Sequence, residues 1–218
     1  MQIRRQSELG QGMTADIWLC EAPHSTEYQL PFLSCLRNDR TLFMEHLRAI
    51  QPLQQANELG LPFDPALMPD KLFWGRNGRF NSKLPPLFHN AFTYLRADVA
   101  DVVLQHDLGD GALRAMEMYQ NDTVSALGET VHAIVIGNAQ ETLDCGLSQL
   151  EPHPNEENRF ILPLSTAGKQ FRARPGFEPF HDIWADPRVS EGFFLSGRLV
   201  EALAGIASPK QLALLPVS

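Results

Sequence analysis

The chain has 218 residues, of which 44% are hydrophobic and 20% are charged, and its formal net charge is −8. This composition is typical of a globular protein, and the length can support one large core or two small ones. Its apolar runs are far shorter than the roughly 20 residues that cross a bilayer, so no membrane-spanning helix and no contact with a membrane are expected.

The start of the chain is polar. Arg4 and Arg5 suggest an export signal, but no apolar segment follows them, so we predict no signal peptide and a cytoplasmic protein. Residues 1–12 are predicted to be a disordered start. Three widely spaced cysteines favour reduced thiols over disulfides or a zinc site. They are Cys20, Cys35 and Cys145.

In the first half, alternating residues predict a strand over 15–20, and Asp39 is expected to open a helix that runs through Ile50. Prolines then predict a stretch poor in regular structure, with a short strand within 71–79. These are Pro52, Pro62, Pro65, Pro69, Pro85 and Pro86. Because Leu, Phe and Trp recur there, we interpret residues 13–90 as a Pro-rich subregion packed on the main core, since a linker would be polar.

The second half shows two similar strand–helix–strand patterns. The first has strands over 91–95 and 113–118 around a helix, and the second has strands over 192–195 and 211–215 around another. The helices share apolar positions at i, i+3 and i+4. The matched positions are Val99, Val102 and Val103 in the first helix and Leu199, Ala202 and Leu203 in the second. Duplication and the spacing common to all amphipathic helices both explain this likeness.

Two further strands are predicted between these units, over residues 130–136 and 159–164, because both segments are rich in branched apolar residues. Together the elements predict an α+β domain over 91–218, with a mixed or antiparallel sheet and a few helices packed on it.

Negative charge is concentrated in the middle third of the chain. Residues 97–157 hold twelve acidic side chains and one basic side chain, Arg114, for a formal charge of −11. Such a field attracts cationic partners and repels nucleic acid. The basic residues elsewhere are too sparse to follow a phosphate backbone, so nucleic-acid binding is not expected.

The common catalytic and phosphate-binding signatures are absent. There is no G-x-G-x-x-G, G-x-S-x-G or H-E-x-x-H pattern, and Ala167-Gly168-Lys169-Gln170 lacks the first glycine and the Ser or Thr of a phosphate loop. Cys145 has no histidine near it in the sequence, and His106 is expected to interact with a helix C-terminus. No cofactor and no metal are predicted.

One segment offers an alternative. His181, Asp182 and Asp186 resemble an acid–base or metal-binding group, since on a helix the two carboxylates would share a face. Pro187 disfavours helical backbone at Asp186, so a turn is the preferred interpretation.

From about Leu84 onward, the chain resembles a family of bacterial polymorphic-toxin immunity proteins, the family numbered eleven. The likeness is carried by Leu84-Pro85-Pro86-Leu87-Phe88, by the strand–helix segment 92–113, by His132 to Asn138, by Asp182 to Pro187, and by Phe193-Phe194-Leu195-Ser196 with the helix after it. The serine that usually opens the family's first helix is replaced by Arg96-Ala97.

The resemblance implies a cytoplasmic, non-catalytic antidote that binds a cognate toxin; it specifies no oligomeric state. An acidic surface would suit a basic toxin such as a nuclease. The acids around the end of the first helix and the strand after it are the candidate contacts: Asp107, Asp110, Glu117 and Asp122. The alternatives are a metal-assisted hydrolase that uses Asp182, Asp186 and His181, and a secretion-system adaptor.

Overall fold

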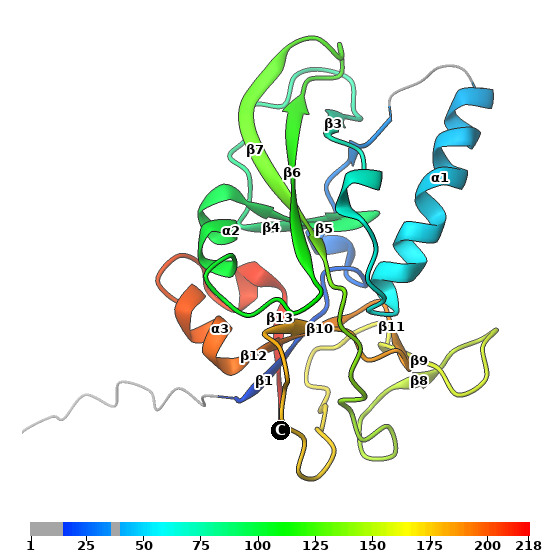
Figure 1. Cartoon of the computed structure of the whole chain (residues 1–218), viewed down its shortest axis with the longest axis vertical. Coiled ribbons are helices and arrows are strands. Elements are labelled where there is room, and N and C mark those ends of the chain that lie inside the picture. The colour runs from blue at the N-terminus through cyan, green and yellow to red at the C-terminus, as the bar shows by residue number, and fades with distance from the viewer. Residues whose placement is uncertain (1–14, 36–39) are drawn as a thin grey trace, which may run out of the picture.

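The computed structural model describes residues 15–35 and 40–218 (Figure 1). The predicted disordered start and Asp39 therefore lie outside the described residues. Within them the fold is α+β, as the sequence predicts, with three α-helices. They are α1 (Arg40–Glu58), α2 (Ala97–Val103) and α3 (Gly197–Leu203). None of the described helices has the length and hydropathy that a membrane crossing requires.

The remaining elements are short. The 3-10 helices are η1 (Thr26–Tyr28), η2 (Pro65–Leu67) and η3 (Lys210–Leu212). The strands are β1 (Ile17–Cys20), β2 (Phe32–Leu33), β3 (Lys71–Trp74), β4 (Leu87–Asn90), β5 (Phe92–Arg96), β6 (Ala112–Tyr119), β7 (Ala126–Val135), β8 (Glu151–Pro152), β9 (Phe160–Ile161), β10 (Ile183–Trp184), β11 (Val189–Ser190), β12 (Phe193–Ser196) and β13 (Leu214–Val217).

The largest sheet has six strands in the order β2-β3-β6-β7-β5-β4. Every neighbouring pair is antiparallel except β3 and β6, so the sheet is mixed. Its centre is the long hairpin of β6 and β7, whose turn projects at the top of Figure 1. The predicted domain boundary at residue 90 falls in the tight turn between β4 and β5, two paired strands of this sheet.

Side-chain alternation along β7 divides the packing between two cores. Val131, Ala133 and Val135 face a core that also contains Ile50 of α1, whereas Ile134 faces a second core that contains residues of α2 and α3. Successive side chains of a strand point to opposite faces, so one strand contributes to both cores. The six-stranded sheet thus lies between α1 on one face and α2 on the other (Figure 1).

The second sheet joins the two ends of the described chain. Its order is β10-β12-β1-β13, and β1 pairs antiparallel with both β12 and β13. The predicted first strand is therefore present, and its partners are the strands at the C-terminus. A third sheet, in the order β11-β9-β8, is made of two-residue strands.

Both predicted strand–helix–strand segments form these elements. In each one the two strands are antiparallel to a common strand between them, which is β7 for β5 and β6 and β1 for β12 and β13. Ser196 caps α3 by accepting a hydrogen bond from the Leu199 N–H, whereas Arg96 gives α2 no such side-chain cap. The repeat relation between the two units stays a prediction.

Two local predictions are wrong. Helix α1 does not end near Ile50 but continues through Pro52 to Glu58. Proline removes one hydrogen bond of a helix, yet Ile50 and Leu53 on either side pack into the core under the six-stranded sheet, and this burial maintains the helix. The closing strand begins at Leu214 instead of residue 211, because residues 210–212 form η3 first.

Candidate functional site

Asp182 is buried, with 1% of its surface exposed, and its carboxylate accepts several hydrogen bonds. The Ser196 hydroxyl and the Arg198 Nε donate to Oδ1, the latter at 2.5 Å, and the Asp107 N–H donates to Oδ2 at 2.9 Å. His106 Nδ1 lies 3.5 Å from Oδ2. Burial raises the pKa of Asp182, but these hydrogen bonds outweigh burial and hold the pKa below its ordinary value. The carboxylate joins α3 to the loop after α2.

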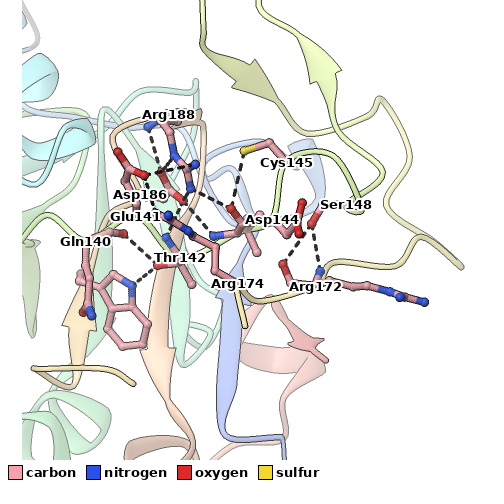
Figure 2. A network of polar contacts seen from close by, with 12 residues as sticks. Gln140, Glu141, Thr142, Asp144, Cys145, Ser148, Arg172, Arg174, Asp186 and Arg188 are labelled. Carbon is pink, nitrogen blue, oxygen red and sulfur yellow. Dashed lines mark hydrogen bonds and ion pairs between the residues drawn. The ribbon is translucent and has the colours of Figure 1, made fainter. Parts of the chain in front are cut away.

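Asp186 is fully buried and belongs to a different network (Figure 2). Its Oδ2 accepts the N–H groups of Thr142 and Leu143 at 2.8 and 3.0 Å and pairs with Arg188 Nη2 at 2.7 Å. The hydrogen bond to Asp186 raises the pKa of the Arg188 guanidinium. Asp186 thus anchors residues 142–143 to the turn before β11.

The surrounding contacts in Figure 2 connect neighbouring segments to this anchor. Trp184 Nε1 donates to the Thr142 hydroxyl at 2.6 Å, and Glu141 pairs with Arg174 at 2.6 Å and with Arg188 at 3.4 Å. Cys145, close to this network, has its pKa raised by burial, which opposes thiolate formation. The contacts around Asp186 therefore hold neighbouring segments of the chain together, which is a structural role.

The structure does not bring His181, Asp182 and Asp186 together. The backbone between the two aspartates contains the extended strand β10, so their Cα atoms, four residues apart, are separated by up to about 13 Å instead of by one helical turn. His181 is partly exposed and its Nδ1 pairs with Asp107 at 3.1 Å. Across residues 15–35 and 40–218, no three His, Cys, Asp or Glu side chains form a metal-binding group.

Asn138 is buried and its side chain bonds to several backbone segments, a role that the sequence alone did not predict. Its Nδ2 lies within hydrogen-bond distance of the carbonyls of Leu108, Ile136 and Ile183, and its Oδ1 accepts the Asp110 N–H. The backbone packs so closely here that a Cβ at Gly109 would lie 2.4 Å from Asn138 Oδ1. A nearby signal was the group of glycines at positions 109, 111 and 137.

The four acids predicted to contact a partner are spread along β6 instead of forming a cluster. Asp107 and Asp110 precede the strand, Glu117 lies within it, and Asp122 follows it in the hairpin turn. An eight-residue strand spans about 25 Å, so the first two acids and the last lie at opposite ends of the hairpin. All four are exposed.

Three of these acids have local bonds. Asp107 accepts the Gly109 N–H and pairs with His181, Glu117 accepts the Tyr119 hydroxyl, and Asp122 accepts N–H groups in its own turn. Hydrogen bonds from Ser125 lower the pKa of Asp122. Among the described residues, the Asp110 carboxylate has no side-chain hydrogen bond or ion pair, so it is the candidate most available to a partner.

Across the acidic segment 97–157, seven acids are exposed and form no salt bridge within the described part of the chain. They are Asp101, Asp110, Glu117, Asp122, Glu129, Glu151 and Glu157. The buried aspartates described above lie outside this segment. The arrangement therefore separates structural carboxylates, which are buried and bonded to arginines, from exposed carboxylates that form no ion pair.

No protein-family model matches the chain, and no curated protein matches it either.

Proposed function

We propose that this protein is a non-catalytic immunity protein, which binds a cognate toxin domain with a basic surface in the cytoplasm and neutralises it. The observation that carries the proposal is the set of seven exposed acids without salt bridges in residues 97–157. The sequence resemblance to polymorphic-toxin immunity proteins adds the biological role.

The acidic surface favours binding of a cationic partner. Exposed like charges repel one another, and a cationic partner relieves this repulsion while its approach is steered by the field. Complementary charge can raise an association rate by about 10- to 1,000-fold at low salt, and screening by salt removes most of that gain. The rate of association should therefore depend strongly on ionic strength.

The chemistry available to the carboxylates points in the same direction. Asp182 and Asp186 are buried and bonded to arginines and backbone N–H groups, so an acid–base role would require these bonds to break. The exposed acids, in contrast, are free to form contacts with a second protein.

The direct test mixes the purified protein with the toxin encoded beside its gene. We expect a 1:1 complex by native mass spectrometry, loss of toxin activity, and an association rate that is lower by about 10-fold or more in 500 mM than in 50 mM salt, because salt screens electrostatic steering. Absence of a complex at low salt would refute the proposal.

Reversing the charge of selected acidic residues tests which part of the surface contacts the toxin. Asp101 lies in α2, and Glu129 lies in β7, close enough to Arg96 at the start of α2 to raise the pKa of its guanidinium. Replacing these two acids and Asp110 by lysine should lower the association rate by about 10-fold or more. The matched control is Glu201→Lys, an exposed residue of α3 outside the acidic segment, which should leave the rate nearly unchanged.

A further inference from the structure

A cavity of about 290 Å³ lies between α1 and the six-stranded sheet. It is lined by residues 54, 57 and 58 of α1, by residues 89 and 91–93 of β4, β5 and the turn between them, and by residues 191–193 at the start of β12, together with residues 23, 134 and 136. This volume is near the lower limit of small-molecule sites, which are typically about 300–1,000 Å³. It therefore suits one extended side chain better than a nucleotide or another large ligand.

Two carboxylates, those of Glu58 and Glu191, line the cavity, and one oxygen of each forms an ion pair with another residue of the protein. Glu58 Oε1 pairs with Arg159 at 2.7 Å, and Glu191 Oε2 pairs with His24 at 2.7 Å. Their side chains are 39% and 52% exposed. Among the described residues, the second oxygen of each has no hydrogen-bond partner, so both remain available to a ligand.

The other polar groups of the cavity also leave acceptors free. Gln54 donates through Nε2 to the Ala91 carbonyl at 3.3 Å, which leaves its Oε1 without a partner in the described residues. Both polar atoms of Asn57 already bond to β7 and the residue after it, because Nδ2 donates to the Ile134 carbonyl and Oδ1 accepts the Ile136 N–H. The free polar atoms are thus mainly acceptors, which selects a ligand rich in N–H donors.

His89 contributes a neutral ring to the same cavity. Its Nδ1 lies 3.1 Å from the Thr93 hydroxyl, and within the described residues Nε2 has no hydrogen-bond partner. Burial lowers the pKa of His89 to about 4, so the ring is uncharged at neutral pH and does not repel a cation.

The backbone beside the cavity is strained at two positions. Ala91 and Glu191 have φ angles of 63° and 62°, which are left-handed values that non-glycine residues seldom adopt. Backbone strain of this kind is concentrated at ligand clamps and switch regions. Here it places Glu191 beside the cavity.

We propose that this cavity receives the guanidinium of one arginine side chain from the basic toxin. The proposal rests on the proposed function, and it assigns the Glu58 and Glu191 carboxylates as the charged partners of that arginine. The cavity is electrostatically linked to the acidic segment, because Arg159 pairs with both Glu58 and Glu156. An arginine held in this way would act on the dissociation rate of the complex, as a buried anchor does.

The first experiment uses the protein without a toxin and N-acetyl-arginine amide as the probe. We expect saturable chemical-shift changes at the amides of Ala91 and Gly192, with a dissociation constant on the order of 1 mM. N-acetyl-citrulline amide, which has a similar shape without the charge, should bind about 10-fold more weakly or worse, because it cannot form the charged contact. Equal binding of the two amides, or the absence of saturable shifts, would overturn the proposal.

Substitution of each carboxylate tests whether it binds the arginine. Glu191→Gln and Glu58→Gln keep the side-chain shape and should each weaken probe binding and raise the toxin dissociation rate by about 10-fold. Glu201→Gln is the matched control and should change neither. An unchanged toxin dissociation rate in both cavity variants would overturn the assignment.

The two proposals fail differently. If the toxin complex forms and depends on salt but the probe does not bind, the cavity proposal falls and the immunity function stands. If the probe binds at Ala91 and Gly192 but no toxin complex forms, the immunity function falls, and with it the toxin as the source of the arginine.

Discussion

Replacement of Asp182 by alanine tests whether this buried carboxylate holds α3 to the loop after α2. The substitution removes the acceptor of the Ser196 hydroxyl, of Arg198 Nε and of the Asp107 N–H. Breaking a buried ion pair typically costs about 3–5 kcal/mol. Because the Arg198 side chain is 62% exposed and can return to water, we expect the lower end, about 3 kcal/mol.

Urea unfolding followed by tryptophan fluorescence measures this loss, and thermal unfolding should show a Tm lower by about 9 °C for a chain of this length. Glu201→Ala, an exposed change on α3, is the control. A loss below about 0.5 kcal/mol, the range of ordinary surface substitutions, would refute the structural role of Asp182.

The pH dependence of the same pair of proteins provides a second measurement. Since the folded pKa of Asp182 lies below its ordinary value of 3.8, the ionised carboxylate stabilises the fold above that value, and the stabilisation is lost as the pH falls through the folded pKa. The difference between wild type and Asp182→Ala should therefore be full at neutral pH and narrow below about pH 4.

Three further substitutions test other features. Asn138→Ala should lower the free energy of unfolding by about 2–4 kcal/mol, because its amide bridges several backbone segments; a loss within the surface range would contradict this in urea unfolding. Thr123→Gly should raise stability by about 1 kcal/mol, since Thr123 has a φ of 64°, whereas Thr130→Gly in β7 should lower it. For His89, the folded pKa of about 4 lies below the ordinary 6.5, so wild type should lose up to about 3 kcal/mol as the pH falls between these values. The profile of His89→Asn should be flatter, and equal slopes would show that His89 is not the group responsible.

The elements that the sequence predicted well are those whose signals are local. Helix α3 has a serine cap at Ser196 and a buried stripe of Leu199 and Leu203, and the observed helix follows both. The strands that were missed, such as β4, β8, β10 and β11, have two to four residues and are defined by partners far along the chain. Pairing of this kind depends on tertiary contacts, which a local pattern does not contain.

The candidate sites were harder to predict for a related reason. The pairing of Asp182 with Asp186 depended on helical spacing, and the extended backbone of β10 directs the two carboxylates to different segments. The cavity beside His89 was not predicted, because its walls come from α1, β4, β5 and a turn one hundred residues away. The exposed acids were visible as a charge pattern, but their spacing along β6 required the hairpin register.

The position of β1 has a consequence for the order of folding during synthesis. Residues 17–20 are synthesised long before both of their partners, which lie at 193–196 and 214–217. Until both β12 and β13 have been synthesised, β1 keeps at least one unpaired edge, and such edges recruit other strands and promote aggregation. Closure of this sheet is a long-range event and should be slow compared with formation of the β6–β7 hairpin. A ribosome stalled shortly before Leu214 would therefore hold a chain whose first strand lacks one of its two neighbours.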